Sequence, residues 1–316
     1  MQHTGSNPIR RATDHPLMLI RLAPAIFVCL WATGFVGARL SMPHAEPMSF
    51  LSIRFALAFA ILGVAALVLK APWPKGWAIV HVMVVGALIH GVYLGGVFWA
   101  VRNGMPGGVS AIVVGLQPVL TAVMAGLWLH EPVTRRHWLG LAIGMAGVLM
   151  VLLPKADLAS SGVTIATVAA CMLSVLGISI GTLYQKRFAS QTDLRTGTAL
   201  QYVGALVPGL IFVSLFESFA ITWNSDTIFA MAWLLFVLSI SAVFLLMWLI
   251  REGSVAKVSA LFFLVPAVAA LMTWALFDET LDLIQIVGMA LCALAVALAA
   301  AKPATPITDS KQGAPS

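Results

Sequence analysis

The sequence predicts an all-α membrane protein with ten transmembrane helices, arranged as two five-helix repeats of opposite topology (5+5). Three observations support this fold class. Apolar residues make up 60% of the 316 residues and charged residues only 9%, whereas a soluble domain carries about 25% charged residues. Long apolar windows follow one another along the chain, and basic residues fall in every second connection between them. A soluble globule and a disordered chain are therefore excluded.

The ten apolar windows are continuous runs, each about as long as the roughly 20 residues that a membrane-spanning helix needs. They lack the strict alternation of barrel strands. We expect helices at 22–40, 48–69, 77–100, 107–129, 136–153, 162–184, 195–216, 227–250, 256–277 and 282–301. Polar tails flank them at 1–21 and 302–316. No cleavage site follows a short apolar core, so the first helix is expected to stay uncleaved.

Most of the 18 Lys and Arg residues lie in the tails and in the second, fourth, sixth and eighth connections. Cytoplasmic loops of membrane proteins are enriched in these residues. Both termini are therefore predicted to be cytoplasmic, which requires an even number of helices. The net charge of +6 then reflects orientation in the cytoplasmic, or inner, membrane, and a nucleic-acid partner is not expected.

The second half of the sequence repeats landmarks of the first half in the same order. The pairs are Pro118 and Pro266, Glu131 and Glu279, Gly140 and Gly288, and Arg54-Phe55 and Gln201-Tyr202. Five helices per repeat is an odd number, so the second repeat must enter the membrane from the opposite side. The basic turn 130–136 and its acidic counterpart 278–282 agree with this. We expect the two repeats at 22–155 and 160–301.

The ordered set of Trp31-Ala-Thr-Gly34-Phe35, Arg54-Phe55 and the duplicated Pro…Glu…Gly run resembles the drug/metabolite transporter superfamily. More narrowly, it is similar to the EamA-type ten-helix transporters of bacteria, over about residues 22–301. The resemblance implies a central cavity between two inverted halves and export of small metabolites, often amino acids. We therefore expect a secondary transporter that works by alternating access, with a small-molecule substrate, the lipid bilayer as its surroundings and no cofactor.

Arg54 is the most informative charge, because it lies about seven residues inside the second window, roughly 10 Å from its start at 1.5 Å per residue. A guanidinium inside the membrane costs about 2.5–3.5 kcal/mol on insertion scales. The side chain could snorkel toward the headgroups, or it could line a cavity and bind a substrate carboxylate or hold a gate. No acidic residue lies in the apolar part of a window to pair with it.

Other polar residues at depth are candidates for the lining of a substrate cavity. His90 lies near the middle of the third window, where it could carry a proton or simply bond a neighbouring helix. The remaining candidates are Tyr93, Gln117, Tyr184, Gln201 and Tyr202.

Pro118 and Pro266 lie about halfway along the fourth and ninth windows, at matching depth. A proline inside a helix removes a backbone donor and frees a carbonyl one turn earlier. We expect a hinge or a substrate-facing kink at each position. The alternative is a kink that serves packing alone, which is common in membrane helices.

Glu131 and Glu279 precede the fifth and tenth windows. A carboxylate just before a helix start interacts favourably with the helix dipole, so we expect a role at the ends of these helices. A role in gating or coupling is the alternative for both carboxylates.

Small residues on one face of the fifth and tenth windows predict close helix packing. They are Gly140, Gly144 and Gly147 in the fifth window and Gly288, Cys292 and Ala295 in the tenth. A homodimer contact is one use of such a face.

Signatures of catalytic and metal sites are absent from the sequence. His130-Glu131 is not followed by the second histidine of an HExxH pair, and neither a P-loop nor a GxSxG motif occurs. The three cysteines form no CxxC pair. We therefore expect no enzyme. The alternative class, an intramembrane enzyme or a lipid-headgroup flippase-like protein, requires His, Asp or Glu side chains clustered near one interface.

Overall fold

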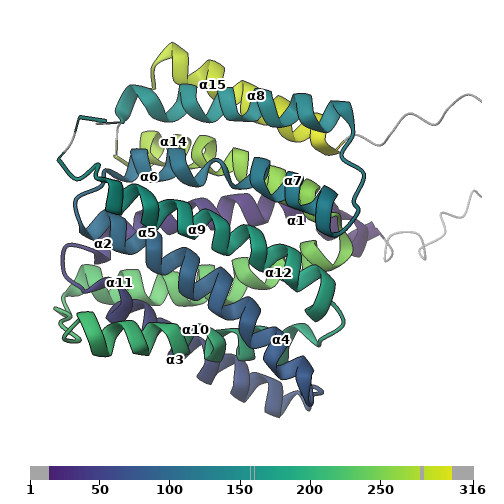
Figure 1. Ribbon diagram of the computed structural model, residues 1–316, viewed down its shortest axis with the longest axis vertical. Coiled ribbons are helices and arrows are strands. Elements are labelled where there is room, and N and C mark those ends of the chain that lie inside the picture. The colour runs from purple at the N-terminus through teal and green to yellow at the C-terminus, as the bar shows by residue number, and fades with distance from the viewer. Residues whose placement is uncertain (1–13, 157, 160, 278–280, 301–316) are drawn as a thin grey trace, which may run out of the picture.

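The computed structural model describes residues 14–156, 158–159, 161–277 and 281–300. Within these residues, all regular structure is helical except for one isolated antiparallel bridge between Ala45 and Ile221. The helices run side by side across the molecule, and α1 begins at the same end of the bundle at which α15 ends (Figure 1).

The helices follow the predicted windows in order, and several windows contain more than one helical segment. The first half contains α1 Asp14–Ala32, α2 Gly34–Ser41, α3 Pro47–Val68, α4 Trp77–Gly86, η2 Ala87–Val92, α5 Tyr93–Arg102, α6 Gly107–Val114, α7 Gln117–Trp128, α8 Arg135–Leu152 and η3 Leu153–Lys155. The second half contains α9 Ile165–Tyr184, η4 Gln185–Ala189, α10 Leu194–Phe216, α11 Ser225–Trp233, η5 Leu234–Ala242, α12 Val243–Glu252, α13 Val255–Ala260, η6 Leu261–Phe263, α14 Leu264–Phe277 and α15 Leu283–Ala300.

Seven helical runs among the described residues are long and apolar enough to cross a membrane. They are Pro47–Val68, Trp77–Arg102, Val109–Trp128, Ile165–Ala189, Leu194–Phe216, Ser225–Glu252 and Val255–Met272. Leu22–Ala32 and Leu283–Ala299 are shorter apolar helices. The predicted total of ten spans stays a prediction.

Polar residues in the connections determine where several helices begin. The Thr134 hydroxyl accepts a hydrogen bond from the His137 amide at the start of α8, at 3.2 Å. Thr164 and Thr167 form a reciprocal capping box at the start of α9. Such caps satisfy amides that have no partner in the first turn, and α8 and α9 begin close to the starts of their predicted windows. The first helix differs from the prediction, because α1 begins at Asp14, inside the segment 1–21 that is predicted to be a polar tail.

The two halves of the chain pack with matching pairs of helices. α3 lies against α10 at one edge of the molecule, and α8 lies against α15 at the opposite edge (Figure 1). α9 of the second half packs on α5 and α7 of the first, and α1 of the first half packs on α12 and α14 of the second. The contacts of α9 with α5 and α7 therefore have counterparts in those of α1 with α12 and α14, with the halves exchanged.

The small-residue faces of α8 and α15 meet inside the chain. A Cβ atom on Gly147 would lie 2.7 Å from the Gly288 carbonyl oxygen, and one on Gly140 would lie 2.9 Å from that of Ala295. The predicted close packing is present, but it joins two helices of one molecule. This face therefore offers no surface for a homodimer contact.

The third, fourth, eighth and ninth windows are interrupted helices. The π-helical segments η2 and η5 occupy equivalent places in the two halves, and π segments are frequent at functional sites. Pro118 lies in the first turn of α7 and Pro266 in the first turn of α14. Each proline thus lies at the start of a new α-helical segment, after a turn at 115–116 in the first half and after the 3₁₀ segment η6 in the second. Proline suits such a position because it has no amide to offer.

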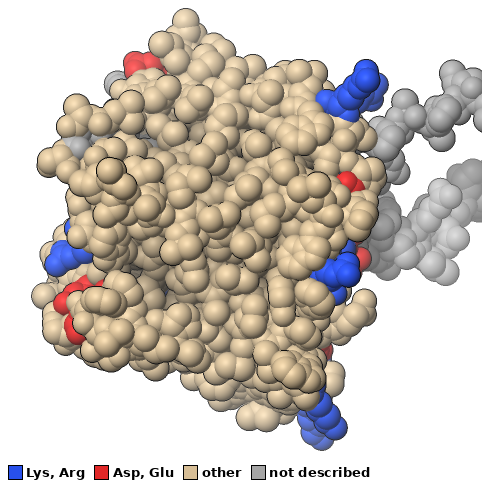
Figure 2. Space-filling model, viewed as in Figure 1, with Lys and Arg blue, Asp and Glu red and all other residues tan. Residues whose placement is uncertain are grey.

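The surface between the two ends of the helices is apolar. On the face in Figure 2, the described Lys, Arg, Asp and Glu side chains lie toward the ends, and the area between them carries none. Large apolar side chains are exposed on the outward faces of the helices, among them Val64, Leu67, Leu127, Leu215 and Ile284. This distribution suits a protein surrounded by lipid hydrocarbon.

Candidate functional site

Four of the predicted site residues, Arg54, His90, Gln201 and Tyr202, lie together where the two halves meet. α3 supplies Arg54, η2 supplies His90, and α10 supplies Gln201 and Tyr202. All four are buried, and Arg54 is only 3% exposed. The side chain of Arg54 is therefore enclosed by the protein and does not snorkel to the surface, and its cavity role stays a prediction.

The amide of Gln201 links His90 to the second half of the chain. Its Oε1 atom lies 3.4 Å from His90 Nε2, and its Nε2 atom donates to Gln185 Oε1 at 3.1 Å and contacts Met247 Sδ at 3.3 Å. Because Gln201 Oε1 can only accept, this network assigns the proton to His90 Nε2. His90 is thus held in one orientation by a neutral partner.

Three rings stack beside this network. The His90 and Tyr202 rings are 4.8 Å apart, and the Phe55 and Tyr202 rings are 5.9 Å apart. The Tyr202 hydroxyl donates to the Ser239 carbonyl in η5. Phe55 and Tyr202 are equivalent positions of the sequence repeat, so their stacking places the boundary between the halves at this point.

Arg54 lacks an anionic partner among the described residues. Its Nε atom is buried with no hydrogen-bond partner, and its guanidinium carbon lies 5.6 Å from the centre of the Phe55 ring. A cation–π contact of this kind contributes about 0.5–2 kcal/mol, less than a buried charge loses by leaving water. The group can therefore attract an anion.

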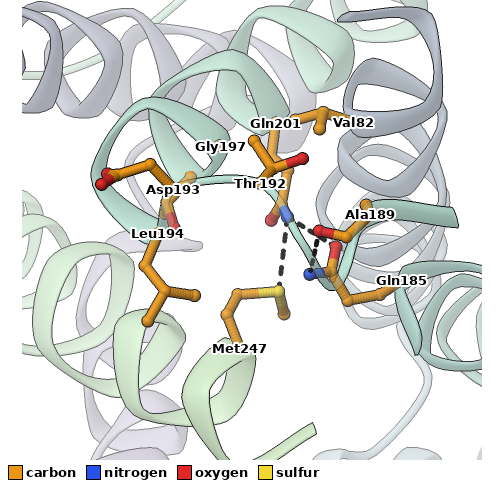
Figure 3. Close-up of a pocket in the computed structure, with 10 residues that line it drawn as sticks. Val82, Gln185, Ala189, Thr192, Asp193, Leu194, Gly197, Gln201 and Met247 are labelled. Carbon is orange, nitrogen blue, oxygen red and sulfur yellow. Dashed lines mark hydrogen bonds between the residues drawn. The ribbon is translucent and has the colours of Figure 1, made fainter. Parts of the chain in front are cut away.

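A small, shallow pocket opens beside the start of α10, and Gln201, Gln185 and Met247 of this network line it. In Figure 3, Gln201, Gln185 and Met247 are joined by hydrogen bonds on one side of the pocket, and Asp193 and Leu194 lie on the other. The side chain of Arg195 donates to Asp193 and lowers the pKa of that carboxyl below its ordinary value. The mouth of the pocket thus carries a paired charge, and its inner wall is neutral and polar.

The other predicted cavity residues lie in separate groups. Gln117 donates to Thr121 at 3.0 Å, and Thr121 donates to Ser179 at 3.0 Å, in a chain between α7 and α9. Tyr93 is buried in the apolar cluster that contains Trp31. The Tyr184 hydroxyl lies 2.8 Å from His81 Nδ1. These residues do not contact the Arg54 group.

Glu131 binds the start of a helix in the opposite half. Its carboxylate accepts the amides of Val255 at 3.0 Å and Ala256 at 3.3 Å, at the first turn of α13. Glu131 thus lies at a helix end, but this helix is α13 and not the predicted fifth window, because the two halves pack across each other. Glu279 lies outside the described residues.

Sequence reasoning missed Gln185, Ser239 and Met247, which complete the polar network. It also missed Glu46 and Glu217, which join α3 and α10 at the far end of the pair. Glu46 occupies the repeat position of Asp193, one residue before a helix start. The repeat could have identified Glu46, whereas nothing in the sequence indicates the partners of Gln185 or Ser239.

A model of the family described as "EamA-like transporter family" matches residues 19–153 and again residues 165–301, once in each half. The matches cover most of the chain, and the boundary between them falls in the connection between α8 and α9.

The relatives found are named as transporters and exporters or carry no functional name. The chain is 26% identical to the uncharacterized transporter YvbV of Bacillus subtilis, over 87% of this chain and 89% of that protein. It is 27% identical to Protein PecM of Dickeya dadantii, over 83% and 85%. It is 24% identical to a probable amino-acid metabolite efflux pump of Salmonella typhimurium, over 84% and 89%.

One solved structure, titled only "Crystal structure of protein", has the same fold. It superposes with a TM-score of 0.74 at 18% sequence identity and covers 88% of this chain and 97% of that one. With the seven apolar helices, these findings describe a multi-pass membrane protein.

Proposed function

The chain belongs to the EamA-like transporter family, and on this premise we propose that it is a secondary transporter that exports small organic metabolites by alternating access. Residues 22–155 and 160–301 then form two five-helix repeats of opposite topology, with ten spans in all. The exchanged packing of the halves and the equivalent π segments support this arrangement. The relative named as an amino-acid metabolite efflux pump supports amino acids or related compounds as substrates.

One observation carries the proposal: a buried polar group that contains an arginine lies between the halves, and one of its members, Gln201, lines a pocket. Ionisable groups inside membrane proteins are expensive and mark the paths of substrates and ions. The pocket opens at the Asp193 end of α10. The distribution of Lys and Arg supports a cytoplasmic location for that end and for both termini. In this orientation, a metabolite inside the cell would enter there.

The interrupted helices supply the hinges of the proposed movement. The breaks before Pro118 and Pro266 divide α6 from α7 and α13 from α14, and the bonds from Glu131 tie α13 to the first half. Rocking of the halves would break and reform such ties at alternate ends. His90 is the candidate for proton coupling, and uniport or exchange driven by the substrate gradient needs no proton carrier.

Efflux from proteoliposomes tests the proposal. Vesicles are loaded with a mixture of amino acids and small organic acids, and mass spectrometry follows each compound outside the vesicles with and without a pH gradient. We expect protein-dependent, saturable efflux of a subset of compounds. Efflux no faster than from protein-free vesicles for every compound would contradict export. Efflux rates that are equal with and without a pH gradient would exclude proton coupling through His90 and favour uniport or exchange.

A further inference from the structure

The fold itself does not require a positive charge at position 54. The equivalent residue of the second repeat is Gln201, a neutral side chain that is hydrogen-bonded at both ends of its amide. Arg54 is equally buried, yet its Nε atom has no partner. A buried guanidinium that is neither paired nor hydrogen-bonded destabilises a protein, so stability does not account for this residue.

Four carboxylates of the described residues have hydrogen-bond partners other than Arg54. Glu46, Glu131, Asp193 and Glu217 all accept hydrogen bonds from backbone amides at helix ends, and Asp193 also pairs with Arg195. No carboxylate of the described residues bonds Arg54. An anion that pairs with Arg54 therefore comes from outside the described residues, and a substrate can supply it.

We propose that Arg54 binds the carboxylate group of the transported metabolite, an inference that rests on the proposed export function. The planar guanidinium fork matches a carboxylate with two parallel hydrogen bonds. A single cation balances a single negative charge, whereas a phosphate carries more charge than this site can neutralise. The substrate class is thus an organic acid with one free carboxylate, and amino acids are included.

The surroundings of Arg54 suit the rest of such a molecule. The stacked rings of Phe55, Tyr202 and His90 present apolar faces beside the guanidinium. Gln201 lines the pocket, and the next residue, Tyr202, stacks on Phe55, whose ring lies beside Arg54. A substrate that enters from the Asp193 end would therefore approach Arg54 past Gln201.

Thermal unfolding of the purified full-length protein in detergent tests the assignment with matched ligands. The probes are pairs of equal shape, isovalerate and isovaleramide, phenylacetate and phenylacetamide, and leucine and leucinamide, together with phenyl phosphate. We expect one or more acids to raise the unfolding temperature and their amides to leave it unchanged, because binding stabilises the native state by mass action.

The variants are Arg54→Gln, which copies the other repeat, and Arg54→Lys, which keeps the charge but loses the fork. We expect the apparent Kd of the acid to rise at least about tenfold in Arg54→Gln and less in Arg54→Lys. Arg102→Gln is the control, because Arg102 is an exposed arginine in the last turn of α5 whose long hydrogen bond goes to the Met42 carbonyl, away from this group. Without ligand, Arg54→Gln should unfold at the same temperature as the native protein or higher.

The possible results separate this inference from the proposed function. Equal responses to acid and amide, a response to phenyl phosphate alone, or undiminished acid binding by Arg54→Gln overturns the carboxylate site. Arg54 would be structural if Arg54→Gln without ligand were clearly less stable than the native protein while Arg54→Lys restored stability and left the acid affinity unchanged. This result also overturns the carboxylate site. If only uncharged compounds show saturable efflux, and Arg54→Gln exports them as fast as the native protein, the carboxylate site is overturned and the proposed transport function stands. Acid binding without efflux of any compound overturns the transporter.

Discussion

The two ends of the α3–α10 pair differ in how they are joined. At the end where α3 starts, Glu217 accepts the amides of Met48 at 3.0 Å and Ser49 at 2.7 Å. In return, Glu46 accepts the amides of Ser218 at 2.9 Å and Ala220 at 2.8 Å. Each half thus supplies a carboxylate to the other, and this end is closed.

At the end where α10 starts, the equivalent carboxylate serves its own helix. Asp193 accepts a hydrogen bond from the backbone amide of Arg195 at 2.9 Å and forms an ion pair with the guanidinium of Arg195 at 2.8 Å. A hydrogen bond from the Thr196 hydroxyl to the Pro72 carbonyl connects α10 to the chain that follows α3. The pocket opens at this end of α10. Equivalent positions of a repeat can therefore have different partners, and here the difference leaves one end accessible.

The largest expected effect comes from separating the helices at the wall of the pocket. A Cβ atom on Gly204 would lie 2.0 Å from the Met83 carbonyl oxygen of α4. Gly204→Ala should therefore force α4 away from α10 and lower stability by about 3 kcal/mol, the upper part of the usual range for overpacking. Denaturant unfolding in detergent measures the change. Gly63→Ala is the control, because its Cβ would have its nearest neighbour at 3.7 Å; equal losses would contradict the contact.

Removal of a carboxylate at the closed end should have the next largest effect. Glu217→Ala loses three bonds to Met48 and Ser49 and should lower stability by about 1–2 kcal/mol, as expected for a lost helix cap. The same change should speed the labelling of a Met48→Cys side chain by a membrane-impermeant thiol reagent, because Met48 is buried under the closed end. Glu252→Ala removes an exposed carboxylate and should change neither quantity; an unchanged labelling rate in Glu217→Ala would argue against closure by this carboxylate.

The closed end should also weaken in acid. Burial tends to raise the pKa of Glu46, but hydrogen bonds from Ala220 and Ser218 outweigh it and hold the pKa below the ordinary value of 4.5. The stabilisation is therefore fully present above about pH 4.5 and is lost as the pH falls through the lower pKa of the folded state. Thermal unfolding across this range should be less pH-dependent in Glu46→Gln than in Glu252→Gln, and identical slopes would exclude this contribution.

The smallest effect is expected at the open end. Asp193→Asn keeps a side chain that can cap α10 but removes the ion pair with the half-exposed Arg195. Such exposed pairs contribute about 0.2–1 kcal/mol, so stability should change by less than about 0.5 kcal/mol. A loss as large as that of Glu217→Ala, measured by the same unfolding experiment, would mean that the two ends are joined equally.

Much of the fold could be predicted because its signals are local. The predicted windows 48–69 and 195–216 agree with α3 Pro47–Val68 and α10 Leu194–Phe216. Apolar runs long enough to cross hydrocarbon, and caps within one turn of a helix start, are properties of neighbouring residues. Breaks at Pro118 and Pro266 were indicated as well, although the form of the break was not.

The candidate site was predictable only in part. Burial of a charge in an apolar window singled out Arg54, and the repeat singled out Gln201 and Tyr202. Tyr93, Gln117 and Tyr184 looked equally suitable in the sequence, yet they belong to other groups. Depth in the membrane can be read from position along a helix, but the direction in which a side chain faces depends on its neighbours.

The sequence by itself determined the membrane class, the order of the helices, the repeat and the unusual charge of Arg54. Only the tertiary structure decided that Glu131 caps α13, that the glycines of α8 meet α15, and that His90 bonds Gln201. The reason is physical: hydrophobicity and helix capping act over a few residues, whereas these contacts join residues far apart in the chain. They exist only once the two halves have packed across each other.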